Sequence, residues 1–555
     1  MANVAWRSLC QQVPARPGFV GFSTAAAAFV DSSPVEVKIH LNKPPIPTPF
    51  PMPTPSSITA APQTQPFPSL LITSSSLTPM GTFAEAQATF INPCSSSVAS
   101  LDSLLASANM GVVAHYYMDV ELQGVLSALS YPHVFIADSL AMGDAAVKMC
   151  EAGCTSVAVL GVDFMAESVR AIMGKSGFSH IPVYRSVEKA IGCSLAESAE
   201  KLVYGAWLEK AKKASNPLHV VYINTSLETK AKSSTIIPTI TCTSSNVVQT
   251  MLQASAEMPG VDLFYGPDTE MGHNLQTMFD GILGSWTDEQ IKKLHPMHDR
   301  ESIKLLRSKL DVFPSGKCVV HQVFNSSVVE TVKSAYPDAY MSAHLEVPGE
   351  MFEVAMSASL ENKGVVGSTA DILNFITEKV EEKATEAKAG KCKGKGKERL
   401  QFILGTEAGM VTSIVKNVQK ILSSTGAGSH VEAEIVFPVA KEAVMVDGEG
   451  GIVPGASGDE GCGTGGGCAT CPFMKMNDLD ALLDLAEMVG DKETMTDLTG
   501  YHPPNRLEGK TWGGESAVEL GIKPILHMRH LTREKKFDPE LVIEVTNFHN
   551  KRQTM

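Results

Sequence analysis

Three cysteines are notable because each follows the same order of sequence motifs. Cys193, Cys318 and Cys471 each come after an apolar run that ends in a glycine, one further residue and an acid. Three thiolates at one site suit a four-iron cluster with one iron left open to substrate, because full ligation would need four. An open iron can act as a Lewis acid. The residues therefore favour such a cluster.

Two other uses of these thiols stay open on the residues alone. Cys468 and Cys471 form a Cys-x-x-Cys pair, which is common in zinc sites and in redox-active dithiols. No second pair completes a structural zinc site, and the pair follows a glycine-rich run instead of opening a thioredoxin-like unit. A regulatory disulfide among Cys462, Cys468 and Cys471 is a further hypothesis.

Polar side chains occur in pairs, two residues apart, at the ends of strand-like runs. The pairs are His115 and Tyr117, Tyr222 and Asn224, and His344 and Glu346. Residues two apart on a strand share one face, and an imidazole beside a carboxylate suits acid-base chemistry near neutral pH. Taken singly, each aromatic or histidine could equally be a core residue, so the repetition is what favours a site.

Hydroxyl residues begin the helical patterns that follow these strands: Ser139, Ser244, Ser368 and Thr369. A helix N-terminus presents unpaired N–H groups and the positive end of the helix dipole, so a hydroxyl there can cap the helix or hold an anion. Capping alone would explain any one of them. Their matched places in the chain favour a site that holds carboxylates or a phosphate.

The elements that must position these residues repeat one plan three times between Gly111 and Cys471. Short β-branched or aromatic runs, each followed by a helical pattern of about 10 to 15 residues, are typical of βαβ units with a parallel sheet. The carboxyl ends of parallel strands face a shared crevice. We therefore expect three small α/β sandwiches whose strand ends converge on one central site.

Composition excludes several classes of protein. The chain has 555 residues, 44% of them hydrophobic, and a net charge of −14. It therefore lacks the basic surface that nucleic acid or an anionic membrane would require. No stretch approaches the roughly 18 consecutive apolar residues that would span a bilayer. Eleven scattered cysteines are too few for a small secreted disulfide framework. We expect no nucleic-acid partner and no membrane partner.

The amino-terminal region is expected to contain a targeting signal followed by a linker. Residues 1–34 contain Arg7 and Arg16 but no acid before Asp31, which is typical of an organellar transit peptide, plastid or mitochondrial. Residues 35–84 are rich in Pro, Ser and Thr and are predicted to be a disordered linker. The predicted units that follow are 85–192, 193–320, 321–490 with a Lys/Gly-rich insertion at 381–398 and a glycine-rich loop, and a carboxyl-terminal extension at 491–555.

In their order along the chain, the motifs resemble those of the quinolinate synthase family over roughly residues 85 to 490. Any one of them would be weak, whereas the ordered set is specific. The matching stretches are Ala114-His115-Tyr116-Tyr117, Ile136-Ala137-Asp138-Ser139-Leu140, Gly161-Val162-Asp163-Phe164-Met165-Ala166-Glu167, Gly192-Cys193-Ser194-Leu195-Ala196, Tyr222-Ile223-Asn224-Thr225, Cys242-Thr243-Ser244-Ser245-Asn246, Gly367-Ser368-Thr369, Gly405-Thr406-Glu407 and Cys471-Pro472-Phe473-Met474-Lys475-Met476-Asn477.

The resemblance implies a fold and a reaction. The fold would be three similar three-layer α/β sandwich domains with parallel sheets, arranged with pseudo-threefold symmetry around a [4Fe-4S] cluster held by Cys193, Cys318 and Cys471. The reaction would condense iminoaspartate with dihydroxyacetone phosphate to give quinolinate, the pyridine precursor of NAD. Phosphate and water would be released without net redox change, which makes the enzyme a transferase with Lewis-acid catalysis.

The resemblance also implies residue roles and partners. His115, Tyr222 and Asn224 would bind substrate, and Tyr117 would assist the proton transfers of isomerisation. His344 and Glu346 would act as acid and base, and the hydroxyls of Ser139, Ser244, Ser368 and Thr369 would hold carboxylates and phosphate. Implied partners are an L-aspartate oxidase or dehydrogenase as iminoaspartate source, and iron-sulfur assembly proteins. A plastid is the preferred location and a mitochondrion the alternative.

This sequence departs from the family pattern in places. His344-Leu345-Glu346-Val347 lacks the usual proline between His and Glu and the usual following cysteine, and Pro267-Asp268-Thr269-Glu270-Met271-Gly272 lacks the usual basic residue. The tail after Asp491 resembles plant-type versions, yet we expect the short Pro-rich region to leave no room for the amino-terminal desulfurase-activating domain of those versions. The alternatives are another cluster-dependent hydro-lyase, a non-catalytic iron-sulfur carrier and a zinc-stabilised binding module.

Overall fold

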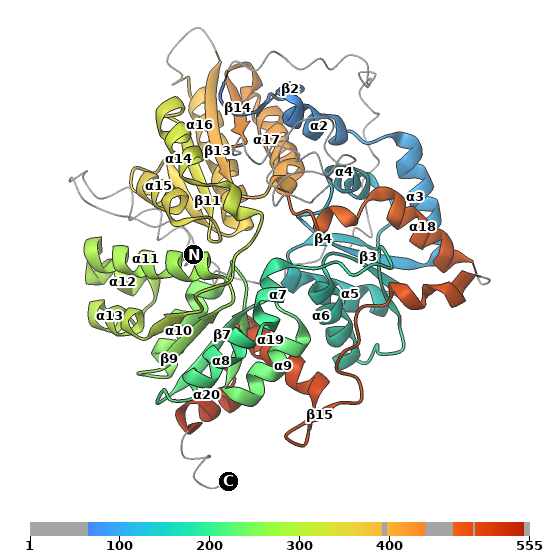
Figure 1. Ribbon diagram of the computed structural model, residues 1–555. Coiled ribbons are helices and arrows are strands. Elements are labelled where there is room, and N and C mark those ends of the chain that lie inside the picture. Colours follow the sequence, from blue (N-terminus) through green and yellow to red (C-terminus); the bar gives the residue numbers. More distant parts are fainter. Residues whose placement is uncertain (1–64, 391–396, 439–469, 492–493, 549–555) are drawn as a thin grey trace.

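Three mainly parallel sheets with flanking helices make up the molecule (Figure 1). This computed structural model describes residues 65–390, 397–438, 470–491 and 494–548. The predicted transit peptide, most of the predicted linker and the glycine-rich loop with Cys462 and Cys468 lie outside the described residues. The prediction of an α/β fold with parallel sheets is confirmed.

The first sheet is parallel throughout and has the strand order β4-β3-β5-β6. Its strands are β3 (Met110–His115), β4 (Val134–Ala137), β5 (Ser156–Leu160) and β6 (Val183–Arg185). The helices of this unit are α3 (Ser95–Ala108), α4 (Val120–Ala128), α5 (Ser139–Glu151) and α6 (Asp163–Lys175). All six residues of β3 are buried, as expected for a strand in the middle of a covered sheet.

The second sheet is also parallel and has the order β10-β9-β7-β8. Its strands are β7 (Pro217–Tyr222), β8 (Thr239–Cys242), β9 (Asp262–Gly266) and β10 (Leu310–Val312). Its helices are α7 (Ser194–Glu200), α8 (Leu202–Ala211), α9 (Leu227–Ile236), α10 (Val247–Glu257), α11 (Thr269–Ser285), α12 (Asp288–Leu294) and α13 (Arg300–Ser308).

The third sheet has six strands in the order β12-β11-β13-β14-β1-β2. The parallel strands are β11 (Tyr340–His344), β12 (Gly364–Gly367), β13 (Glu398–Gly405) and β14 (Val431–Val436), and β1 (Ser69–Ile72) and β2 (Leu77–Met80) continue the sheet antiparallel. Its helices are α14 (Ser326–Ala335), α15 (Gly349–Ser359), α16 (Thr369–Lys388) and α17 (Val411–Thr425), with α2 (Thr82–Phe90) following β2.

The four parallel strands of each sheet lie in one common order, which is second, first, third, fourth along the chain. In the sequence, each cysteine follows the apolar run that ends in a glycine, and this run is the third parallel strand along the chain in each sheet, β5, β9 or β13. A fourth strand lies between this run and each cysteine: Cys193 comes after β6, Cys318 after β10 and Cys471 after β14. Because β6 and β10 have only three residues each, they are too short to give a periodic signal.

Two predicted irregular segments are partly regular. Residues 69–80 of the predicted linker form β1 and β2, because Ser69 to Ile72 is an apolar run that pairs with the open edge of β14. Residues 381–388 of the predicted insertion continue α16, since alternating Glu, Lys and Ala favour a helix. Only the segment 391–396 of that insertion lies outside the described residues.

The segments after Cys471 do not stay with the third sheet. Helix α18 (Leu479–Gly490) packs against α3 of the first unit, although it falls inside the predicted third unit. The predicted extension contains the short strands β15 (Thr511–Trp512) and β16 (Glu515–Ser516), α19 (Ala517–Glu534) and α20 (Pro539–Thr546). Helix α19 packs on α9 and also touches α6 (Figure 1), so the extension joins the first and second units.

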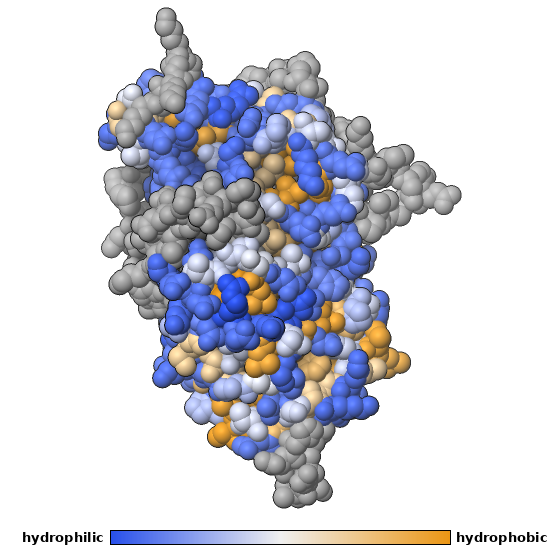
Figure 2. All heavy atoms as spheres, turned by 90° about the vertical axis from the view of Figure 1, so that its left-hand side faces the viewer, coloured by the Kyte–Doolittle hydropathy of each residue, from blue (hydrophilic) through white to orange (hydrophobic). Residues whose placement is uncertain are grey.

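Core packing divides the molecule differently from the sheets. Most buried apolar residues of the second and third units belong to one continuous cluster, and most of those of the first unit form another with apolar residues between 474 and 498. A small third cluster around Tyr204 and Phe313 lies within the second unit. Hydrophilic residues predominate on the face in Figure 2, and hydrophobic ones occur there in scattered groups. Of the helices in the described part of the chain, none has both the length and the hydropathy to cross a membrane.

We predict that Leu70→Ala destabilises the protein by ~2–5 kcal/mol, because the Leu70 side chain on β1 is fully buried and its loss leaves a cavity. Leu77→Ala on the half-buried edge strand β2 should cost less. Denaturant unfolding of a chain that begins at Gln65 measures both. Equal losses would show that β1 does not pack as a buried strand of the third sheet.

Candidate active site

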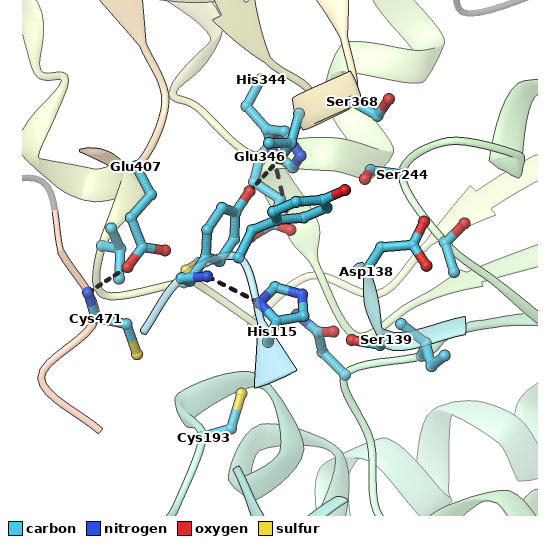
Figure 3. Close-up of a pocket in the computed structure, with 18 of the residues that line it drawn as sticks. His115, Asp138, Ser139, Cys193, Ser244, His344, Glu346, Ser368, Glu407 and Cys471 are labelled. Carbon is cyan, nitrogen blue, oxygen red and sulfur yellow. Dashed lines mark hydrogen bonds and ion pairs between the residues drawn. The ribbon is translucent and has the colours of Figure 1, made fainter. Parts of the chain in front are cut away.

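A buried cavity of about 160 Å³ lies where the carboxyl ends of the three sheets meet (Figure 3). Strand β3 ends at His115, β7 at Tyr222 and β11 at His344. Every residue that the sequence predicted for the site borders this cavity: His115, Tyr117, Ser139, Cys193, Tyr222, Asn224, Ser244, Cys318, His344, Glu346, Ser368, Thr369 and Cys471.

Two histidines take the same conformation in the first and third units. The Nδ1 atom of His115 accepts a hydrogen bond from the Tyr117 N–H at 3.2 Å, and Nδ1 of His344 accepts from the Glu346 N–H at 3.3 Å. Burial lowers the pKa of His115 to about 4 and that of His344 to about 3. Both rings are therefore neutral, and each keeps its proton on Nε2 as a donor for a ligand.

Glu346 is a carboxylate that is only 3% exposed. The Tyr222 hydroxyl donates to its Oε1 atom, and the Nδ1 atom of His321 lies 3.1 Å from its Oε2 atom. Burial opposes ionisation, but His321, His344 and the Tyr222 hydroxyl hold the pKa of Glu346 below its ordinary value. The side chain is thus a charged group fixed by neighbours from the second and third units.

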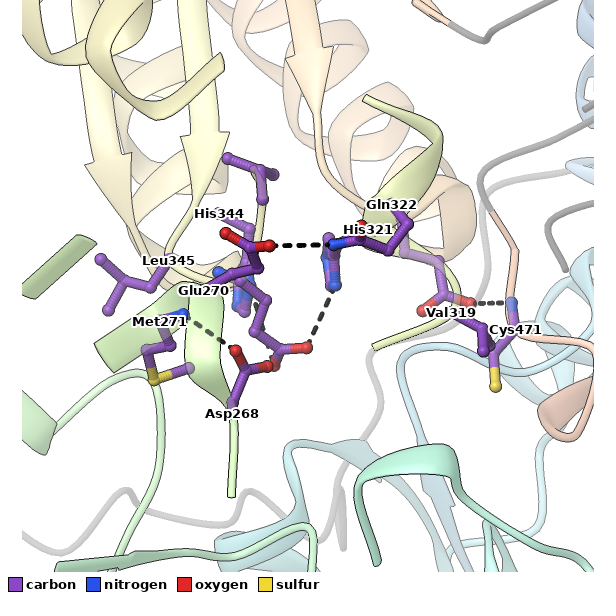
Figure 4. Close-up of polar contacts among 12 residues, drawn as sticks. Asp268, Glu270, Met271, Val319, His321, Gln322, His344, Leu345 and Cys471 are labelled. Carbon is purple, nitrogen blue, oxygen red and sulfur yellow. Dashed lines mark hydrogen bonds and ion pairs between the residues drawn. The ribbon is translucent and has the colours of Figure 1, made fainter. Parts of the chain in front are cut away.

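His321 is a cavity residue that the sequence reasoning did not assign to the site. Its ring stacks on His344 with centroids 4.9 Å apart, and neither ring nitrogen makes an aligned hydrogen bond to a described residue. The side-chain donor atoms of Cys318, His321 and Glu346 lie within 4.8 Å of one another and could hold a metal ion. The side chains of His321 and His344 are labelled in Figure 4. Its place three residues after Cys318 in the sequence could have indicated that His321 belongs to the site.

Tyr117 connects the first unit to the third. Its hydroxyl lies 2.5 Å from Oγ1 of Thr369, the first residue of α16. Burial raises the pKa of Tyr117 far above its ordinary value, and the carboxyl groups of Glu407 and Glu346 raise it further. The phenol is therefore protonated at neutral pH and can donate a proton.

Helix N-termini, and not basic side chains, supply the positive potential at the cavity. Among the described residues that border it there is neither Lys nor Arg. Ser139 is the first residue of α5, Ser244 comes shortly before α10, and Ser368 is the N-cap of α16. Unpaired N–H groups and the helix dipole attract an anion at such positions.

Only one of the expected hydroxyl caps is present. Ser368 accepts a hydrogen bond from the Asp371 N–H and caps α16, but Asp138 caps α5 in place of Ser139. Asp138 therefore borders the cavity as a cap that the sequence reasoning missed. Since the Asp138 carboxylate accepts from two N–H groups there, the Ser139 hydroxyl has no capping role.

Acidic residues follow the third strand of every sheet. Asp163 begins α6, Asp268 caps α11, and Glu407 accepts a hydrogen bond of 2.6 Å from the Cys471 N–H. Burial, followed by the charge of Glu346, raises the pKa of Asp268, and burial likewise raises that of Glu407. Glu407 borders the cavity, so it adds an acid that the sequence had placed in a motif without a role.

The three predicted cysteine ligands fit a shared metal centre. Cys193, Cys318 and Cys471 are free thiols that border the same cavity. Burial raises the pKa of Cys193 to about 11. Burial also raises the pKa of Cys471, and Glu407 and Cys193 raise it further. Buried thiols with raised pKa values lose their protons when a metal binds, because the metal replaces the missing hydration. The donor set therefore suits an iron-sulfur cluster.

The fold and the cavity define the class as an α/β protein with a buried polar site that carries acid-base groups and metal-binding thiols. The family described as "NadA: Quinolinate synthetase A protein" matches residues 99–496. A chloroplastic quinolinate synthase of Nicotiana tabacum is 47% identical over 497 residues, which cover 87% of this chain and 67% of that protein. The chloroplastic quinolinate synthase of Arabidopsis thaliana is 45% identical over 505 residues, covering 88% and 68%.

Bacterial relatives match a shorter stretch. A quinolinate synthase of Trichormus variabilis is 29% identical over 279 residues, which cover 50% of this chain and 66% of that protein. The chain belongs to the quinolinate synthase family. The sequence resemblance to this family is thereby confirmed.

We predict that alkylation of the metal-free chain at neutral pH modifies Cys94 well before Cys193. Cys94 is exposed and hydrogen bonds from Ser96 lower its pKa, whereas burial raises the pKa of Cys193 to about 11. Only the thiolate reacts, so the rate at Cys193 should rise as the pH approaches that value. Mass spectrometry after timed iodoacetamide exposure measures the order, and equal rates at both thiols would contradict it.

Proposed function

We propose that this chain condenses iminoaspartate with dihydroxyacetone phosphate to form quinolinate for NAD biosynthesis, releasing phosphate and water. The observation that carries the proposal is the convergence of every predicted site residue on one buried cavity, in a chain of the quinolinate synthase family. The cavity offers neutral histidines, a fixed carboxylate and three helix N-termini. Such a set suits two small anionic substrates that must be joined and then dehydrated.

The cofactor in this proposal is a [4Fe-4S] cluster held by Cys193, Cys318 and Cys471. When bound, it would supply an open iron that acts as a Lewis acid in a reaction without net redox change. The three half-buried thiols at the cavity support this assignment, and so does the absence of a fourth cysteine among the described residues that border it. On this account the enzyme is a transferase.

Substrate binding is assigned to groups from all three units. His115, Tyr222 and Asn224 bind polar groups of the substrates, with the His115 Nε2–H as a donor. The hydroxyls of Ser139, Ser244, Ser368 and Thr369 hold carboxylates and phosphate. The N-termini of α5, α10 and α16 support them, because the cavity border has no basic side chain to do so.

Proton transfer is assigned to three side chains. Tyr117 is a buried, protonated phenol and serves the isomerisation steps. His344 and Glu346 act as acid and base, with Glu346 charged and His344 neutral at the start. His321 contacts both of them, so it belongs to the same proton-transfer group.

The finer organisation of the chain follows the same proposal. We assign pseudo-threefold symmetry to the three α/β sandwiches, supported by their common strand order and by the matched places of their cysteines. The units are 85–192, 193–320 and 321–490, with β1 and β2 added to the third and α18 packed on the first. Residues 1–34 are the transit peptide, and 491–555 are an extension that joins two units.

Location and partners complete the proposal. The chain acts in plastids, in agreement with the chloroplastic names of its plant relatives. An L-aspartate oxidase or dehydrogenase supplies iminoaspartate, which hydrolyses readily and must be used soon after it forms. Separate iron-sulfur assembly proteins load the cluster.

We predict that the chain from Gln65 onward, purified without oxygen and reconstituted with iron and sulfide, forms quinolinate from dihydroxyacetone phosphate and freshly generated iminoaspartate. Cys318→Ser should form none, because one cluster ligand is lost. Chromatographic quantification of quinolinate measures both. An intact cluster with both substrates and no product would overturn the synthase assignment and favour a hydro-lyase or an iron-sulfur carrier.

A second prediction concerns the phenol. Tyr117→Phe should lower kcat by about 10² or more, the usual size of a lost proton-transfer group, while KM changes little. Tyr340→Phe on the same strand as His344 is the control, because Tyr340 does not border the cavity. Steady-state kinetics of both variants decide the matter, and a Tyr117 variant with unchanged kcat would remove this residue from the acid-base set.

A further inference from the structure

Lys230 on α9 is a lysine with no solvent exposure. Its Nζ atom donates hydrogen bonds to the Ile223 carbonyl at 3.1 Å, to the Thr225 hydroxyl at 2.9 Å and to the Thr225 carbonyl. An ammonium group has three N–H donors and no acceptor. Three oxygen acceptors around Nζ therefore match the charged form of Lys230.

These acceptors belong to the turn between β7 and α9, whose residues face the cavity. Tyr222, Ile223 and Asn224 all border the cavity. The Thr225 hydroxyl also donates to the Tyr222 carbonyl at 3.0 Å. This hydroxyl therefore links Lys230 to the Tyr222 backbone. The lysine thus holds the backbone on both sides of Asn224.

The first unit encloses Lys230 from the other side. Glu167 on α6 is 4% exposed, and its Oε2 atom accepts a hydrogen bond of 3.0 Å from the Leu227 N–H at the start of α9. The Phe164 ring, which borders the cavity, has its centroid 6.0 Å from the lysine nitrogen. Burial lowers the pKa of Lys230 to about 7, while the charge of Glu167 raises it.

Burying an ammonium group costs several kcal/mol of desolvation, and a well-packed apolar side chain of similar volume would avoid that cost. A contribution to folding stability therefore does not explain why a lysine occupies this buried position. Its three bonds fix one short turn, and that turn carries two side chains assigned to substrate binding, Tyr222 and Asn224. The position of the charge is explained if the site needs that turn in a single conformation.

We propose that Lys230 is a positioning residue whose ammonium group holds the 222–225 turn and thereby orients Tyr222 and Asn224 toward the substrate. The identity of that substrate rests on the proposed function, but the effect on the turn does not. Lys230 does not border the cavity and takes no part in proton transfer.

A second buried lysine provides a matched control. Lys379 on α16 is 3% exposed, its Nζ atom donates to Glu382 at 2.8 Å, and it lies 5.7 Å from the Phe375 ring centroid. It resembles Lys230 in burial, in its acidic neighbour and in its aromatic neighbour. The difference is that Lys379 does not border the cavity, and neither does Glu382, to which it is hydrogen bonded.

The test compares Lys230→Met with Lys379→Met in the cluster-loaded enzyme. Only Lys230→Met should weaken quinolinate binding and raise KM, each by about tenfold or more, which corresponds to ~1.4 kcal/mol. Its kcat should fall less than its kcat/KM. Hydrogen exchange in a peptide that covers residues 222–226 should be faster in Lys230→Met than in Lys379→Met.

The outcomes separate this inference from the proposed function. If both variants exchange and bind alike, Lys230 is only structural and the inference is wrong. If the wild type makes no quinolinate but the exchange difference is present, the synthase assignment fails and the positioning role stands. Should Lys230→Met not fold, Thr225→Val, which removes one acceptor, must raise KM and speed exchange at 222–226; no change in either would overturn the inference.

Discussion

A carboxylate buried between two sheets must be compensated by its neighbours, and Glu346 sets this requirement for the whole site. Leaving such a charge unpaired costs several kcal/mol, so the surrounding groups cannot be chosen independently. Tyr222 donates to it from the second sheet, while His321 and His344 lie beside it from segments after β10 and at the end of β11. The carboxylate thus ties the second unit to the third where their strands end.

The same low-polarity surroundings explain why the cavity works without basic side chains. Burial keeps His115 and His344 neutral, and Tyr117 protonated, so the border offers hydrogen-bond donors but few full charges. Anions are then held by helix N-termini, whose partial charges are fixed by the backbone and need no counter-ion. The buried ammonium group of Lys230 is satisfied by oxygens of the 222–225 turn behind the cavity.

The fold was largely predictable, because a strand followed by a helical pattern leaves a periodic signal and the carboxyl ends of parallel strands meet at one edge. The prediction of a disordered linker was wrong for residues 69–80, because it rested on amino-acid composition alone. Ser69 to Ile72 lies in a Pro- and Ser-rich stretch, yet it is a buried strand, because the edge of β14 was open for pairing. Helix α18 lies next to the third sheet in sequence but packs on α3, which no local pattern could indicate.

For the site, the sequence by itself determined which residues meet, since its repeated motif order placed His115, Tyr222 and the cysteines at equivalent strand ends. It did not determine what each group does there. Only the tertiary structure decided that Asp138 caps α5 in place of Ser139, that His321 lies beside Glu346, and that Lys230 donates hydrogen bonds to the backbone on both sides of Asn224. The reason is physical. The pKa values, hydrogen-bond partners and burial of these groups depend on neighbours that are distant in the chain, and the local sequence pattern does not indicate which neighbours these are.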